Sequence, residues 1–199
     1  MAIDFDFDKK SKKPLLMKIF IEIFIWAAMI AAVIFLAYFI IYYAVEKTNM
    51  VGISMEGTLD QDDPIIINKF SYRFKNPERF DVIVFKQSGR EHAYYNIKRI
   101  IGLPGETIRM EDGNIYINDE IIEEPINAEP MGNYGLAGEG VTLDENEYFV
   151  LGDNRNNSED SRFASIGNIT KDEIIGKASL RLSPFNFISK LNLKQEIKE

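Results

Sequence analysis

The stretch Ile23–Val45 constrains the fold of this chain most strongly, because it runs for 23 residues without a charged side chain. A helix of that length covers roughly 34 Å, which is enough to cross a hydrocarbon core of about 30 Å. Trp26 lies near one end of the stretch and Tyr42 near the other, as aromatic residues at a membrane interface do. We therefore expect a transmembrane helix over residues 23–45.

The charges around this segment predict its orientation. Five lysines precede it, namely Lys9, Lys10, Lys12, Lys13 and Lys18. The positive-inside rule then makes residues 1–22 a cytoplasmic tail and residues 46–199 an extracytoplasmic domain of a single-pass cell-membrane protein, with the lipid bilayer as a partner. A cleaved signal peptide is the alternative, but the apolar run is longer than an ordinary h-region and no small-x-small site follows Ala44.

Composition excludes several classes of protein. The 199 residues include no cysteine, which excludes disulfides and thiolate chemistry, and one histidine, His92, which excludes a His-rich metal site. Residues 1–45 carry five lysines against four acidic residues, so the net charge of −8 leaves residues 46–199 with an excess of nine negative charges. Nucleic-acid binding favours a basic face, so we expect no nucleic acid as a partner.

Beyond Lys47 the chain has the pattern of strands and turns. Thr107–Asn118 is typical of a β-hairpin with its turn at Asp112-Gly113. We expect a mainly β fold, with an antiparallel β-sheet ectodomain closed or folded over a single core, one N-terminal transmembrane helix, and residues 106–150 as a smaller β extension. The tail from Phe187 predicts at best a short helix. The further runs rich in β-branched and aromatic residues are Asp63–Phe70, Arg79–Gln87, Tyr94–Gly102 and Glu147–Asn154.

Two adjacent cations, Lys98 and Arg99, lie in one of these apolar strands. Neighbouring residues of a strand point to opposite faces, so one of the two must face a buried side. A buried lysine loses its proton more easily, and a general base near neutral pH needs a pKa roughly 2–3 units below about 10.4. The pattern alone favours a Lys98 that snorkels at a strand end, a Ser54 that is a turn residue, and a His92 on the surface.

Five segments follow one another in a characteristic order: GISMEGTL (52–59), RFDVIVF (79–85), IKRIIGLPGE (97–106), LGDNRNNSEDSR (151–162) and GKASLRLSPF (176–185). Taken together they resemble type I signal peptidase, the membrane-bound Ser/Lys endopeptidase that removes signal peptides from exported proteins. The resemblance covers almost the whole chain, and its size and single span are similar to the short enzymes of Gram-positive bacteria. It implies a signal-peptidase-like fold, pre-protein signal peptides as partners, cleavage after small-x-small sites similar to Ala-x-Ala, and no cofactor or metal.

The resemblance also implies roles for single residues. Ser54 would be the nucleophile, Lys98 the general base, and Ser158 a hydroxyl that hydrogen-bonds and orients the lysine amine. The backbone N–H of Ser54 would donate to the oxyanion. Gly52 stands where some relatives carry a serine hydroxyl as the second oxyanion donor.

Four more residues of the segment 151–162 would support the site. The resemblance implies that Asp153 and Arg155 stabilise it, and that Asp160 and Arg162 pair beneath it with bidentate geometry. The same segment does not fit a calcium-binding loop, because Arg155 stands where the third position requires a ligand.

Two positions depart from the family's pattern. Gly57 replaces the usual proline, which predicts a looser loop behind Ser54. Asn96 replaces a tyrosine, with Tyr95 one step away, which predicts a Lys98 that is wetter and has a less depressed pKa.

These departures motivate the alternative of a non-catalytic or dedicated-substrate homologue that acts in the assembly of surface structures such as pili. A related self-cleaving Ser-Lys regulator is a second alternative, but that class is soluble and carries a DNA-binding domain. The sequence predicts no oligomeric state and assigns no role to Met131–Glu145.

Overall fold

The computed structural model describes residues 13–87 and 95–191, which divide into a helical unit ending at Tyr43 and a β unit beginning at Ala44. The long helix α1 (Lys13–Ala44) has 32 residues. Over Met17–Ala44 it is long and apolar enough to cross a membrane, and among the residues that the structure describes it is the one helix with that property. Val45, where the predicted span ends, is already the first residue of β1.

The β unit consists mainly of short antiparallel strands. They are β1 (Val45–Asn49), β2 (Pro64–Asn68), β3 (Val82–Phe85), β4 (Asn96–Gly102), β5 (Thr107–Glu111), β6 (Asn114–Ile117), β7 (Glu120–Ile121), β8 (Val141–Thr142), β9 (Glu147–Leu151), β10 (Ile169–Thr170), β11 (Ile174–Leu182) and β12 (Phe185–Phe187). The helical elements of this unit are α2 (Ser71–Phe74) and the 3₁₀ turns η1 (Gly135–Gly138), η2 (Lys171–Glu173) and η3 (Ile188–Lys190).

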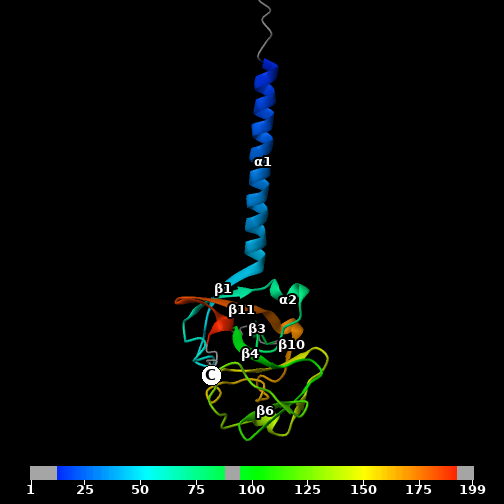
Figure 1. The fold of residues 1–199 in the computed structure, drawn as a ribbon, viewed down its shortest axis with the longest axis vertical. Coiled ribbons are helices and arrows are strands. Elements are labelled where there is room, and N and C mark those ends of the chain that lie inside the picture. The colour runs from blue at the N-terminus through cyan, green and yellow to red at the C-terminus, as the bar shows by residue number, and fades with distance from the viewer. Residues whose placement is uncertain (1–12, 88–94, 192–199) are drawn as a thin grey trace, which may run out of the picture. The chain divides into compact units, whose positions relative to one another are not determined.

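These strands form two antiparallel sheets (Figure 1). The larger has the order β1-β2-β11-β3-β4-β9-β10, with β12 paired to β11, and the smaller has the order β7-β6-β5-β8. The strand β11, which comes late in the chain, therefore lies between β2 and β3. The prediction of a mainly β, antiparallel fold with one N-terminal apolar helix is confirmed.

The strongest local signals in the sequence are also confirmed. The predicted runs contain β2, β3, β4 and β9, and the hairpin of β5 and β6 turns at Asp112 and Gly113. Both turn residues have positive φ, 50° and 80°, as a two-residue hairpin turn requires. In the tail from Phe187, where at best a short helix is predicted, Phe187 ends β12 and the short 3₁₀ turn η3 follows at Ile188–Lys190; residues 192–199 lie outside the described residues.

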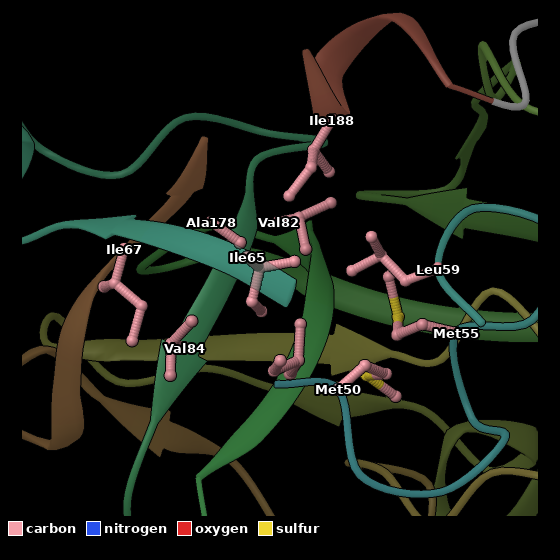
Figure 2. Packing of buried hydrophobic residues seen from close by; sticks show 10 residues of the cluster. Met50, Met55, Leu59, Ile65, Ile67, Val82, Val84, Ala178 and Ile188 are labelled. Carbon is pink, nitrogen blue, oxygen red and sulfur yellow. The ribbon is translucent and has the colours of Figure 1, made fainter. Parts of the chain in front are cut away.

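The expectation of a single core is wrong, because the buried side chains form three clusters. One lies beneath the β2 end of the larger sheet (Figure 2), and another fills the other side of the same sheet around Phe85 and Ile100. The third joins the smaller sheet to β9 through residues such as Ile108 and Phe149. The smaller sheet has an apolar face of its own, which must be buried against another element.

Candidate active site

Residues 50–63 connect β1 to β2, and buried side chains hold this loop in place on both sides of Ser54. Met50, Met55 and Leu59 are at most 1 % exposed and belong to the first core cluster (Figure 2). The amide of Leu59 also donates to the carbonyl of Met55 over 2.8 Å. Ser54 is therefore presented at the surface by a loop whose neighbours are fixed in the core.

Gly57 occupies a backbone conformation that proline cannot adopt. Its φ is +93°, whereas the proline ring fixes φ near −65°. A proline at position 57 would therefore not fit the backbone of this loop. The predicted loosening is not what the structure shows, because Met55 and Leu59 on either side are fully buried.

Lys98 lies in the middle of β4, opposite Ile83 of β3, and is 4 % exposed. Its Nζ donates a hydrogen bond of 2.7 Å to Oγ of Ser54. The interpretation from pattern alone, a lysine that snorkels at a strand end, is therefore wrong. The expectation that Asn96 leaves this lysine wet also fails, because the strand is covered on both faces.

Burial lowers the pKa of the Lys98 ammonium to about 8. The negative charges of Asp160, Glu159 and Asp153 oppose this shift without cancelling it. At that pKa about a tenth of the amine is neutral at pH 7, and a neutral amine can accept the proton of a serine hydroxyl. The pair can thus form a nucleophile and its base.

Arg99 is buried as well, so both adjacent cations face covered sides of the sheet. Its guanidinium forms a bidentate ion pair with Asp153, with Nε–Oδ1 at 2.9 Å and Nη2–Oδ2 at 2.6 Å. Thr58 of the serine loop donates to the same carboxylate over 2.5 Å. Asp153 therefore supports the site through Arg99 and Thr58, two residues that the motif reasoning missed. The signal for Arg99 was its place beside a lysine in an apolar strand.

Asp160 and Arg162 form the expected bidentate pair, with Nε–Oδ1 at 2.7 Å and Nη2–Oδ2 at 2.9 Å. Both are at most 1 % exposed. The carboxylate also accepts the amide N–H of Gly152 at 3.0 Å. The pair consequently fixes the start of the loop that follows β9.

Gly152 lies where the Ser54 loop (residues 50–63) meets the loop that follows β9. A Cβ at position 152 would lie 2.2 Å from Oγ of Ser158 and 2.5 Å from the carbonyl oxygen of Ser54. The amide of Asn154 donates to that same carbonyl over 3.1 Å. Only a residue without a side chain permits this approach.

The predicted hydrogen bond between Ser158 and Lys98 is not formed in this structure. The Oγ of Ser158 is buried and has no hydrogen-bond partner within the part of the chain that is described. The Ser158 hydroxyl packs against Gly152 and therefore lies beside the Ser54 loop. A buried hydroxyl without a partner is a donor that a substrate, a water or a moved lysine can use.

Arg155 pairs with Glu124 of the segment that follows β7, and not with Asp153. Its Nη1 donates to Oε2 of Glu124 over 2.8 Å, and a second bond joins Nη2 to Oε1. The Nε of Arg155 donates to the carbonyl of Gly152 over 3.1 Å. Glu124 thus connects the smaller sheet's side of the molecule to the loop that carries Ser158.

The stretch Met131–Glu145, which the sequence left without a role, begins with further contacts to this loop. The amide of Gly132 donates to the side chain of Asn156 over 2.9 Å. The carbonyl of Asn133 accepts from Arg162, and the amide of Leu136 donates to the carbonyl of Arg162, both at 2.9 Å.

The predicted oxyanion donors lie in the Ser54 loop. The amide N–H of Ser54 contacts no acceptor among the residues that the structure describes, and Gly52 has a φ of +80° in the same exposed loop. His92 lies outside the described residues. Within those residues no group of three or more His, Asp or Glu side chains is arranged to hold a metal ion.

Comparison with known proteins adds a family to this geometry. A family model described as "Signal peptidase, peptidase S26" matches residues 23–183. The chain is 40 % identical over 147 residues to a probable signal peptidase I-2 of Synechocystis, covering 71 % of this chain and 65 % of that protein, which is slightly less than two thirds of its length.

Further relatives are similar. Identity to a signal peptidase I of Leptolyngbya laminosa is 41 %, over 69 % of this chain and 68 % of the relative. Identity to signal peptidase I V of Bacillus subtilis is 38 %, over 64 % of this chain and 80 % of the relative. A crystal structure of a signal peptidase I from Enterococcus faecalis aligns with a TM-score of 0.42 at 35 % identity, covering 52 % of this chain and 97 % of the other.

Proposed function

Because the chain belongs to the peptidase S26 family of signal peptidases, we propose that it is a membrane-anchored serine endopeptidase that removes N-terminal signal peptides from exported pre-proteins. The observation that carries this proposal is the 2.7 Å hydrogen bond between Lys98 and Ser54. Burial keeps the pKa of that lysine near 8, so the base is available close to neutral pH. The alternative of a non-catalytic assembly protein has no support in this geometry, which keeps both reacting groups in contact.

The reaction is acyl transfer in two steps. Neutral Lys98 takes the hydroxyl proton of Ser54 as Oγ attacks the scissile carbonyl, and the protonated amine then gives a proton to the leaving amine. The resulting ester on Ser54 is hydrolysed by a water that the neutral lysine activates. Both steps of the reaction use the side chains of Ser54 and Lys98 and one water molecule.

The developing oxyanion accepts a hydrogen bond from the amide N–H of Ser54. This N–H contacts no other acceptor among the described residues. The buried hydroxyl of Ser158 orients the lysine amine or the attacking water when substrate fills the site. Gly52 offers no side-chain donor, so its contribution is the close approach of its backbone. The ion pairs of Asp153 with Arg99 and of Asp160 with Arg162 hold the two loops in register.

The substrate is an extended peptide that adds to the edge of a sheet and ends in small side chains, as in Ala-x-Ala. In this proposal α1 spans the cell membrane once with its N-terminus in the cytoplasm, the span ends at Ala44 and not at the predicted Val45, and the domain from Val45 onward lies outside. Residues 106–150 form a smaller β extension of the catalytic domain. The anchor raises the effective concentration of the site where signal peptides emerge from the bilayer.

The decisive experiment is cleavage of a pre-protein with an Ala-x-Ala site by the full chain in detergent. We expect activity from the wild type and its loss, by a factor of about 10³ or more, in Ser54→Ala and Lys98→Ala. The matched controls are Ser179→Ala and Lys86→Ala, which remove the same groups outside the site and leave the rate unchanged. Equal cleavage by Ser54→Ala would overturn the assignment. A folded wild type that cleaves nothing would favour the non-catalytic alternative.

A further inference from the structure

We propose that Glu159 is a specificity-determining residue which, with the pocket beside it, selects pre-proteins that carry a lysine or arginine as the second residue of the mature protein. This inference rests on the proposed function and adds a substrate preference to the same site. We call the cavity the Glu159 pocket. Six residues of the loop that follows β9 line it, namely Asn156, Asn157, Ser158, Glu159, Phe163 and Ser165.

The Glu159 pocket has the size and chemistry to hold one long cationic side chain. Its volume is about 380 Å³, and Glu159 is the one charged residue among those that line it. The other walls offer amide and hydroxyl groups and the ring of Phe163. A carboxylate attracts an ammonium or guanidinium group, and an aromatic ring packs against the aliphatic stem that carries it. The lining therefore fits lysine or arginine.

The carboxylate of Glu159 is free to take such a partner. Glu159 is exposed, and it forms no hydrogen bond or ion pair with the residues that the structure describes. Its neighbours differ, because Asp153 and Asp160 are each held in a buried ion pair with an arginine. The charge of Glu159 nevertheless reaches the reacting groups: burial lowers the pKa of Lys98, and Glu159 is among the carboxylates that oppose this shift. Glu159 is thus an unpaired charge beside the site.

Ser158 forms the border between the Glu159 pocket and the nucleophile. Its Oγ and the carbonyl oxygen of Ser54 are close neighbours, since a Cβ at position 152 would lie 2.2 Å from the first and 2.5 Å from the second. Asn157, the lining residue before Ser158, donates to Oδ1 of Asn154 over 3.1 Å. The amide of Asn154 in turn donates to that carbonyl of Ser54. The pocket therefore begins directly beside the Ser54 loop.

The proposed mechanism decides which half of the substrate reaches this pocket. Lys98 gives its proton to the leaving amine, so the mature part of the pre-protein leaves the scissile bond on the side of the lysine. Glu159, whose charge acts on Lys98, lies on that side as well. The Glu159 pocket consequently receives a side chain of the mature protein and not of the signal peptide.

The alternation of an extended peptide selects the second mature residue. Neighbouring side chains of such a peptide point to opposite faces. In an Ala-x-Ala site the two small residues face the enzyme and x faces away, so the first mature residue faces away and the second faces the enzyme. The second residue lies about 7 Å beyond the scissile bond, at about 3.3 Å per residue. A long side chain at that position can enter a pocket that begins at Ser158.

The test measures kcat/KM of the full chain in detergent for pre-proteins that differ only at the second mature residue, which is lysine, glutamine or glutamate. The wild type is compared with Glu159→Gln and Glu159→Lys. The readout is the ratio between substrates, because any change that a variant causes in the pKa of Lys98 affects all three substrates alike. The matched control for net charge is Glu145→Gln, which replaces an exposed glutamate ahead of β9. A further pre-protein carries the lysine at the tenth mature residue instead.

We expect the wild type to prefer lysine to glutamate about fivefold, because an ion pair at a partly exposed site adds a modest attraction and a like charge a similar repulsion. Glu159→Gln should remove the preference, Glu159→Lys should reverse it, and Glu145→Gln should keep it. An unchanged preference in Glu159→Gln would overturn the proposal. An equal gain from lysine at the tenth residue would do so too, since the field of the whole acidic domain would then be the cause.

The same data separate this inference from the proposed function. Cleavage of all the pre-proteins without a preference would overturn the role of Glu159 alone. Failure of the folded wild type to cleave any of them would overturn the proposed function and this inference with it.

Discussion

The Nζ of Lys98 donates to Oγ of Ser54 over 2.7 Å, although the two residues are 44 positions apart in the chain. Each is held by its own surroundings, Lys98 by a covered strand and Ser54 by a loop with Met55 and Leu59 in the core. Their contact is therefore present before any substrate binds. In the proposed mechanism, the protonation state of this lysine is then the variable that controls activity.

The first prediction is a rate that rises with pH. The pKa of Lys98 is lowered to about 8, so the neutral base increases from about a tenth at pH 7 to about nine tenths at pH 9. We expect kcat/KM for a fixed pre-protein to rise about tenfold over that range and then to level off. A profile that is flat from about pH 6 to 10 would contradict the role of this lysine.

The lowered pKa of Lys98 also predicts that the free energy of unfolding depends on pH. Between about pH 8 and the ordinary value of 10.5 the unfolded chain keeps a proton that folded Lys98 has released. Stability contributed by this group therefore rises with pH across that window and is constant below it. Urea unfolding of the wild type and of Lys98→Met at pH 7 and 9.5 measures the effect, which the variant should lack.

Gly152→Ala should inactivate the protein without unfolding it. The added Cβ would lie 2.2 Å from Ser158 Oγ and 2.5 Å from the carbonyl of Ser54, so one of the two loops must move. A displacement near 1 Å costs on the order of 10²-fold in rate. Gly132→Ala is the control, because its nearest atom would be at 3.5 Å. Wild-type activity in Gly152→Ala would show that the two loops need not meet as closely as here.

Asp153→Ala should destabilise the domain strongly. It leaves the buried guanidinium of Arg99 without its carboxylate, and loss of one partner of a buried pair costs about 3–5 kcal/mol. The exposed pair of Arg109 and Glu111 gives the comparison, since Glu111→Ala should cost less than about 1 kcal/mol. Chemical denaturation of both variants measures the difference. Similar values for the two would mean that water reaches Arg99.

Glu124→Gln tests whether the contact with Arg155 positions the second loop. The substitution keeps the size of the side chain and removes one partner of the ion pair, so we expect kcat to fall about tenfold with little change in KM. Glu123→Gln, an exposed neighbour, should have no effect on either constant. A rise in KM alone would instead place Glu124 in substrate binding.

Gly57→Pro should disrupt the nucleophile loop, although the family usually has proline there. At a φ of +93° the proline ring cannot be accommodated, so the loop must change its path past Ser54. We expect a loss of activity and a fall in melting temperature of several degrees. Gly57→Asn is the conservative comparison, because asparagine tolerates positive φ better than other residues. Full activity in Gly57→Pro would refute the backbone conformation described for this loop.

The sequence predicts the elements of this fold better than it predicts the contacts between them. Ile23–Val45 and the hairpin at Asp112-Gly113 follow from local patterns, and the observed helix and turn agree with them. The partner of Asp153 could not be predicted from local patterns, because Arg99 lies 54 positions away and only the assembled sheet brings the two residues together. The ion pair of Glu124 and Arg155 likewise joins residues that are distant in the chain and could not be predicted from local patterns.

The sequence also could not predict the conformation and burial of certain single residues. The sequence predicts looseness at Gly57, but this glycine has a φ of +93° and lies between the buried side chains of Met55 and Leu59. Lys98 was interpreted from pattern as a snorkelling residue, because alternation alone cannot reveal that both faces of β4 are covered. Both errors come from tertiary packing, which overrides local preference.

The place of β11 has a consequence for when the protein becomes active. This strand, residues 174–182, lies between β2, which follows the Ser54 loop, and β3, which pairs with the strand of Lys98. The two halves of the site are therefore joined in one sheet only after the chain has been made as far as β11. In the proposed topology those residues must also have crossed the membrane. A chain whose β11 is still in transit would remain inactive, so the late position of this strand delays the onset of activity.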